Sequence, residues 1–181
     1  MALARRIQQP DPEAEAELIL GQIAFESGQL PAAAPRLARA RQISMSVGDR
    51  RGAANACSWQ GRLALAEGRL PQAAELLSEA LQAMQLYSMR GPLLGVLDDV
   101  AWWSLRRDQP ALAQVLVCAA DVLRQRTALP RSPFAQAQRQ ALQAELSQTT
   151  ALPVADATAS ADGWDTETAV RQALAALRQS G

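Results

Sequence analysis

The apolar residues of this chain recur at the spacing of an α-helix. Between residues 71 and 87 the apolar positions follow the i, i+3, i+4, i+7 rule of one helical face, with polar residues between them: Ala73, Leu76, Leu77, Ala80, Leu81 and Met84. No stretch of comparable length alternates apolar and polar residues as a half-buried strand does. The pattern therefore predicts an all-α protein.

Proline and glycine indicate where the helices begin and end. Proline is tolerated in the first turn of a helix, and glycine is favoured just after the last turn. With Asp11 and Ser132 as N-caps, the pattern predicts about seven long antiparallel helices and a short C-terminal one, near residues 12–27, 31–47, 50–67, 71–87, 92–107, 110–126, 133–148 and 166–179. Residues 149–163 lose the helical period and are rich in Thr, Ala, Ser and Asp, so we expect a loose linker there.

A sequence repeat connects the first helices. The segment "GQIAFESGQLPAAAPRL" (21–37) returns 40 positions later as "GRLALAEGRLPQAAELL" (61–77), and a weaker third copy follows in the same register. We therefore expect helix pairs near 12–47, 50–87 and 92–126 and a helix at 133–148, forming one repeat domain over 1–148, then the linker and a C-terminal helix within 164–181. A fixed period predicts an α-α superhelix, in which each hairpin packs only on its neighbours.

The recurring letters of the repeat are mostly small. Two helices approach to about 8 Å only where the side chains between them are small. We therefore assign a packing role to one recurring set: Gly21, Gly28, Ala33, Ala40, Gly61, Gly68, Ala73, Ala80, Ala101, Ala113 and Ala120.

The copies resemble the tetratricopeptide repeat: a small residue, a glycine before the turn, an alanine in the next helix, a large apolar residue and another alanine. "LGQIAFESGQLPAAAPRLARA" (20–40) and "QGRLALAEGRLPQAAELLSEA" (60–80) follow this order, and "VAWWSLRRDQPALAQVLVCAA" (100–120) follows it in part. The long period is similar to that of the C-terminal superhelix of MalT, AfsR and LuxR-type bacterial regulators. The tail is similar to their last helices in "LVCAADVLRQRTALPRSPFAQAQRQALQAEL" (116–146) and "GWDTETAVRQALAAL" (163–177). The chain departs from these regulators in having neither a glycine-rich phosphate loop nor a helix-turn-helix module.

Composition narrows the chemistry. The chain has 18 basic and 18 acidic residues, and all the basic ones are arginine, so net charge is zero and a nucleic-acid footprint is not expected. Without histidine or lysine it lacks the usual general base near neutral pH and the Schiff-base nucleophile, so we expect no enzyme, no metal and no cofactor. We interpret Cys57 and Cys118 as small core residues, and Asp98-Asp99 as solvated or groove-lining.

These observations predict a non-catalytic protein-interaction module. It would be the regulatory or sensing repeat region of a bacterial transcription-regulator ATPase, or a free-standing relative. No secretory signal or membrane span is evident, so we expect a cytoplasmic protein. Trp59 and Trp103 are expected in the core. The resemblance implies a concave face that binds a protein or peptide partner through Gln22, Phe25, Asn55, Ser58, Arg62, Asp98, Trp102 and Arg106. The alternative is a superhelix that binds a small-molecule inducer.

Overall fold

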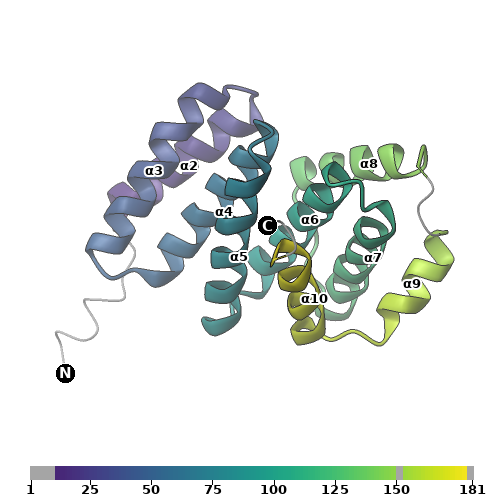
Figure 1. Cartoon of the computed structure of the whole chain (residues 1–181). Helices are drawn as coiled ribbons and strands as arrows, with labels where there is room; N and C mark the ends of the chain where they lie inside the picture. The colour runs from purple at the N-terminus through teal and green to yellow at the C-terminus, as the bar shows by residue number, and fades with distance from the viewer. Residues whose placement is uncertain (1–10, 150–152, 179–181) are drawn as a thin grey trace. The chain divides into compact units, whose positions relative to one another are not determined.

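The computed structural model describes residues 11–149 and 153–178, and the regular elements in these ranges are all helices (Figure 1). The described part is an all-α protein whose consecutive helices pack on one another, so the predicted fold class is confirmed. The helices are α2 (Pro12–Glu26), α3 (Leu30–Ser46), α4 (Arg50–Ala66), α5 (Leu70–Leu86), α6 (Arg90–Arg106), α7 (Pro110–Thr127), α8 (Pro133–Leu146), α9 (Val154–Asp162) and α10 (Thr166–Arg178). No helix in the described ranges has the length and apolar character that crossing a bilayer requires.

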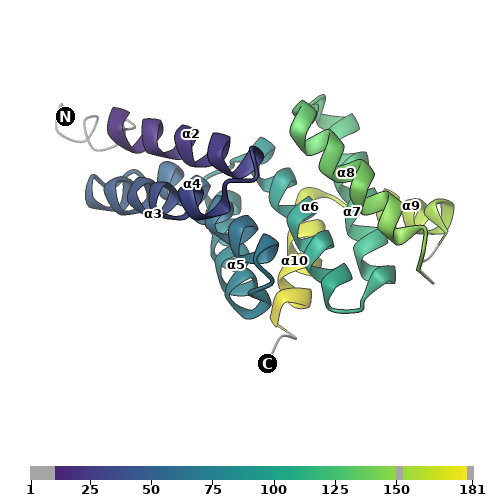
Figure 2. The ribbon, with the colours of Figure 1, turned by 90° about the horizontal axis from the view of Figure 1, so that it is seen from above.

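The chain divides into two compact units, where the sequence predicted one repeat domain over 1–148. The N-terminal unit is Met1–Met89 and the C-terminal unit is Arg90–Gly181, so the boundary falls between α5 and α6. In the N-terminal unit, α2 pairs with α3, α4 pairs with α5, and α3 also packs on α4 (Figure 2). In the C-terminal unit, α6 and α7 form the central pair, and α8, α9 and α10 pack on one or both of them.

Six turns with one geometry separate the helices at intervals of 20 residues. At each turn one residue has a left-handed backbone with φ between 52° and 77°: Gly28, Gly48, Gly68, Ser88, Asp108 and Ala128. In every case the amide of the following residue bonds the carbonyl five positions back, as Arg69 N–H does to Ala64 O at 2.8 Å. This is the Schellman arrangement, which satisfies the last carbonyls of a helix and reverses the chain within three residues.

The glycines in the middle of α2 and α4 hold the hairpins close. A Cβ atom on Gly21 would lie 2.6 Å from Leu37 Cδ2, and one on Gly61 would lie 2.9 Å from Leu77 Cδ2. Both leucines are fully buried. A leucine of the second helix therefore fills the space that a side chain on the first helix would need.

The third hairpin solves the same packing problem with a different pair. Ala101 and Val117 lie 40 positions after Gly61 and Leu77, and both are fully buried. Compared with the second hairpin, alanine adds a methyl group where the glycine was, and valine removes a methylene group where the leucine was. The recurring alanines Ala33, Ala40, Ala73, Ala80, Ala113 and Ala120 are at most 1% exposed.

Residues 149–163 contain a helix where the sequence predicted a loose linker. Helix α9 buries Ala157 and Ala161, one turn apart, against Cys118 and Ala119 of α7. The carbonyls at its end are bound by a side chain of α7, since Arg126 donates to Trp164 O at 3.1 Å and to Asp162 O. The linker interpretation was wrong because the buried stripe consists of alanine alone, which a search for larger apolar residues does not detect.

Helix α10 packs on α6 and α7 of its own chain and buries a full apolar stripe: Ala169, Val170, Ala173, Ala176 and Leu177.

The expected N-caps of α2 and α8 are confirmed, since Asp11 accepts from Glu13 N–H at 2.9 Å and Ser132 accepts from Ala135 N–H at 3.2 Å.

At the left-handed turn positions, introducing a glycine and removing one should change the free energy of unfolding in opposite directions. Ala128→Gly should stabilise the C-terminal unit by about 0.5–1 kcal/mol, because an L-residue with a left-handed backbone is strained. Gly68→Ala should destabilise by about 1 kcal/mol from backbone strain alone, since a Cβ there meets nothing within 4 Å. Urea unfolding of each variant measures both effects. Equal midpoints for the two variants and the unmodified chain would contradict the assignment.

The glycine–leucine contact predicts a compensating pair. Gly61→Ala should cost about 1–2 kcal/mol as overpacking, and Leu77→Val about 1 kcal/mol as a lost methylene. The double variant reproduces the residues of the third hairpin and should cost less than the sum of the two. A double-mutant cycle by urea unfolding measures the coupling. Gly91→Ala is the matched control, because open space surrounds a Cβ at that position.

Candidate functional site

An aromatic pair connects the first helices of the two N-terminal hairpins. The rings of Phe25 on α2 and Trp59 on α4 lie 5.7 Å apart, edge to face at 73°. Both side chains are partly buried and pack against the same cluster, which contains Leu37 and Leu63. The pair therefore has one side anchored in the core and one side accessible from solvent.

Arg62 completes this group. Its guanidinium lies over the Trp59 ring, 4.3 Å from the ring centroid, one helical turn further along α4. An arginine over an indole combines cation–π attraction with flat stacking, worth about 0.5–1 kcal/mol at an exposed position. We call Phe25, Trp59 and Arg62 the aromatic–arginine cluster. A flat apolar surface next to a guanidinium is suited to an extended peptide or a helix that carries a carboxylate.

The other predicted residues of this unit contribute unequally. Gln22 and Asn55 are partly exposed on α2 and α4. Ser58 is only 9% exposed, and its hydroxyl donates to Asn55 O at 2.8 Å, so it belongs to the interior of α4. Trp59 was predicted as a core residue, but it lies in the cluster. The signal that could have placed it there was the arginine three positions later on the same helix.

Two of the predicted residues in the C-terminal unit, Trp102 and Arg106, form a second tryptophan–arginine pair. Arg106 lies over the Trp102 ring at 5.2 Å from the centroid, and it also pairs with Glu145 of α8 at 3.1 Å. Trp102 is partly exposed, whereas Trp103 is 1% exposed and belongs to the core, as expected. Trp102 and Arg106 thus repeat the tryptophan–arginine stacking of the N-terminal unit, with the arginine four positions after the tryptophan instead of three.

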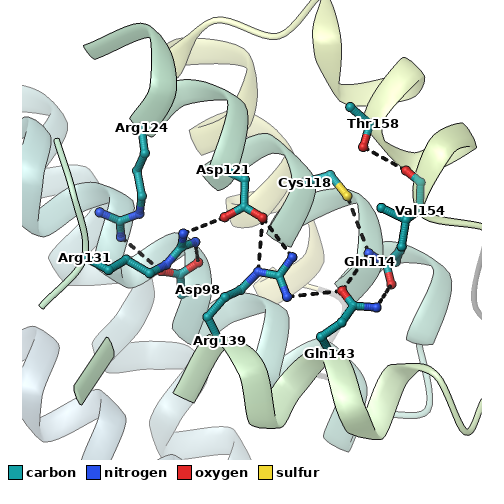
Figure 3. A network of polar contacts seen from close by, with 10 residues as sticks. All are labelled: Asp98, Gln114, Cys118, Asp121, Arg124, Arg131, Arg139, Gln143, Val154 and Thr158. Atoms are coloured by element: carbon teal, nitrogen blue, oxygen red, sulfur yellow. Dashed lines mark hydrogen bonds and ion pairs between the residues drawn. The ribbon is translucent and has the colours of Figure 1, made fainter. Parts of the chain in front are cut away.

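Asp98 belongs to an internal ion network and was wrongly interpreted as solvated or groove-lining (Figure 3). Its carboxylate accepts from Arg124 at 3.0 Å and from Arg131 at 2.8 Å, and its side chain is 15% exposed. Its neighbour Asp99 is 5% exposed. The sequence could not place Asp98, because Arg131 follows it by 33 positions in a loop with no helical period.

The network continues from Asp98 to α8. Arg131 also reaches Asp121 at 2.5 Å, and Asp121 accepts from Arg139 at 2.8 Å. Arg139 then donates to Gln143 at 3.1 Å. This ion network therefore joins α6, α7, the loop before α8 and α8 itself through alternating charges (Figure 3).

The centre of the ion network is Arg131, whose side chain is 8% exposed. Burial alone lowers the pKa of its guanidinium, but hydrogen bonds and attraction from Asp98 and Asp121 outweigh burial and raise that pKa above its ordinary value. Its three nitrogens all donate to these two carboxylates. Arg131 is thus committed to holding helices together.

Two cavities lie beside the ion network. One of 450 Å³ is lined by Arg139, Gln140 and Gln143, and one of 540 Å³ by Arg124, Leu129 and Pro130, while Asp121, Arg131 and Gln136 line both. These volumes are in the range of small-molecule sites, about 300–1,000 Å³. Most of their lining residues are of polar type, although more of the exposed lining surface is apolar than polar, and the charged residues among them form ion pairs within the ion network.

The two cysteines occupy the core, as expected. Cys57 and Cys118 are free thiols with 1% and 3% exposure. Loss of solvation on burial raises the pKa of the Cys57 thiol to about 12. The thiol donates a hydrogen bond to the carbonyl oxygen of Leu76 at 3.3 Å. The thiolate, which is the reactive form, is therefore disfavoured. Within the described residues no three histidine, cysteine or acidic side chains converge in a way that would hold a metal ion.

No protein-family model matches this chain, and no curated protein or solved structure matches it either. The likeness to the regulator superhelix therefore rests on the sequence letters alone.

Neutralising Asp98 should destabilise the C-terminal unit. Asp98→Asn keeps the shape of the side chain but leaves Arg124 and Arg131 without their shared carboxylate. Breaking a buried pair in this way costs about 3–5 kcal/mol. Urea unfolding measures the loss. Glu145→Gln is the control, because the Arg106–Glu145 pair is about half exposed and should be worth less than about 1 kcal/mol. A loss no larger than that of the control would contradict a role for Asp98 in stability.

Cys57 should resist thiol reagents until the protein unfolds. At pH 8 we expect rapid labelling of Cys57 in urea and no labelling of this thiol in buffer. Mass spectrometry of the labelled peptides measures both.

The raised pKa of Cys57 also sets the direction in which protein stability changes with pH. Stability linked to Cys57 should be complete below the ordinary thiol pKa of about 8.5 and should decline as pH rises from there toward the folded-state value. A Cys57→Ala variant should lose this alkaline component, and an unchanged alkaline profile would refute the linkage.

Proposed function

We propose that this chain is a non-catalytic protein-interaction module that binds a segment of a partner protein on the face formed by α2 and α4. The observation that carries the proposal is the aromatic–arginine cluster: Phe25, Trp59 and Arg62 gathered on two adjacent helices, with ring and guanidinium in contact. Tryptophan, tyrosine and arginine are the side chains that dominate binding energy at protein interfaces. A rigid helical repeat also presents such anchors at low entropic cost.

The composition supports the same proposal. The chain has no histidine or lysine, and its net charge is zero. In the most buried charged cluster, around Arg131, the carboxylates and guanidinium groups pair with one another. The resemblance to the tetratricopeptide repeats of bacterial regulators suggests that the partner belongs to a signalling system, with the module as its sensing arm.

A site-specific photocrosslinker tests the proposal. The amino acid p-benzoylphenylalanine is placed at Gln22, which is partly exposed beside the cluster, and in a control at Glu75, which is exposed on α5. We expect one dominant adduct in cells from position 22 and none of the same mass from position 75. The crosslinked protein is then purified, and its affinity for the full chain is measured.

Single substitutions then establish which side chains bind. Arg62→Ala should weaken the affinity at least about tenfold, equivalent to 1.4 kcal/mol, and Arg62→Lys should recover only part of it, because lysine cannot stack flat on Trp59. Trp102→Ala tests whether the C-terminal unit contributes. Glu75→Ala should leave the affinity unchanged. Unchanged affinity in the Arg62→Ala and Trp102→Ala variants would refute binding through these groups.

A second candidate is the binding of a small-molecule inducer. The observation that favours it is the pair of cavities beside Arg131, of 450 and 540 Å³. A ligand that binds only the folded chain raises its melting temperature by mass action. A thermal-shift screen of anionic and polar metabolites should therefore give a rise of several degrees for a true ligand. Loss of that rise in Gln140→Ala, which lines one cavity, would place the ligand there.

A further inference from the structure

The outer face of α2 is apolar and open to solvent. Ile19, Leu20 and Ile23 are 47%, 44% and 55% exposed, and Ala16 lies beside them in the same i, i+3, i+4, i+7 stripe. We call these four residues the α2 outer face. Single exposed apolar residues are common on protein surfaces, but a continuous helical stripe of them is typical of a binding surface.

The repeat shows what such a stripe does when another hairpin precedes it. Forty positions further on, the same four positions on α4 are Ala56, Trp59, Gln60 and Leu63. The preceding hairpin covers them: the Trp59 ring packs on Phe25 of α2, Arg41 of α3 donates to Gln60 at 3.2 Å, and Leu63 is 3% exposed in a cluster with α2 and α3 residues. The α2 outer face therefore occupies the position of a seam between helices, and no described helix covers it.

The charged residues of α2 itself are all acidic. Residues 11–26 contain five acidic residues and no basic one. Glu15 lies one turn before Ile19 and Glu26 three positions after Ile23, and both carboxylates are exposed on that side of the helix. Glu13 and Glu17, by contrast, are bound by Arg39 and Arg36 of α3.

This border of carboxylates selects the occupant. An anionic lipid surface would be repelled, and so would the α2 outer face of a second copy, which carries the same glutamates. Arginine already fills the corresponding role inside the chain, since Arg41 of α3 reaches past Gln60 to Glu79 of α5 at 2.6 Å.

We propose that the α2 outer face binds an amphipathic helix of a partner protein, with an apolar stripe flanked by arginine or lysine, in the way that α3 packs on α4. The apolar stripe would cover Ile19, Leu20 and Ile23, and the basic flanks would pair with Glu15 and Glu26. This surface is distinct from the aromatic–arginine cluster, so the two proposals can fail separately.

Isoleucine methyl spectroscopy of the full chain tests this proposal at residue level. The chain contains four isoleucines, at positions 7, 19, 23 and 43, so selective δ1-methyl labelling gives few signals. The probe is a synthetic 20-residue helical peptide with a leucine stripe and arginine flanks, and its matched control carries glutamate in place of every arginine. We expect saturable shifts of the Ile19 and Ile23 signals with the basic peptide, while Ile43 on α3 stays unchanged.

Fluorescence anisotropy of the labelled peptide then measures affinity. The basic peptide should bind at least about tenfold more tightly than the acidic one, with a dissociation constant that rises with salt. Ile19→Gln/Ile23→Gln should abolish binding, and because both positions are half exposed, the melting temperature should stay unchanged. Glu15→Gln/Glu26→Gln should weaken binding of the basic peptide at least about threefold and reduce its salt dependence.

Three results would overturn the proposal. Equal affinity for the basic and acidic peptides would remove the charge selection. Shifts of Ile43 without shifts of Ile19 and Ile23 would place the peptide elsewhere. Changes of the Ile19 and Ile23 signals on dilution of the protein alone would assign the surface to a second copy of the chain.

Discussion

The structure depends on a reversal of the chain within three residues at a fixed interval. Each long helix from α3 to α6 has 17 residues, so a turn of the same geometry follows every 20 residues. Only a left-handed residue lets the chain turn back while the last carbonyls of the helix remain bonded. Because helices of equal length reverse at equal intervals, residues 40 apart occupy equivalent positions in successive hairpins. The contacts of one hairpin can therefore be transferred to the next.

Because successive hairpins are equivalent, small and large residues alternate across each helix contact in the same way. Close approach of two helices needs a gap on one of them, and Gly21 and Gly61 provide it for Leu37 and Leu77. The hairpins then bury faces made mainly of small and aliphatic residues, which pack by van der Waals contact. In the described residues of the C-terminal unit, no further hairpin of this kind follows the third. There α8 is attached through the ion network around Arg131, while α9 and α10 pack by alanine-rich stripes.

The sequence predicted the helices well, because proline and glycine lie next to their ends and act locally. It did not predict the left-handed turns at Ser88, Asp108 and Ala128, where the geometry of the hairpin overrides the preference for glycine. Helix α9 was missed because Ala157 and Ala161 carry its packing. Of the candidate site residues, Phe25 and Arg62 each contact the ring of Trp59, a residue that the sequence pattern places in the core.

Arginine serves two different purposes in this structure, and burial separates them. Around Arg131 each guanidinium is desolvated, so it must be matched by carboxylates, and the matched groups have little capacity left for a ligand. Near Trp59 the guanidinium of Arg62 lies on an aromatic ring at a partly exposed position. The same residue type therefore serves both a buried ion network around Arg131 and a partly exposed stack on Trp59. The difference lies in exposure: the Arg131 side chain is 8% exposed and is held by two carboxylates, whereas Arg62 stacks on a ring at a partly exposed position.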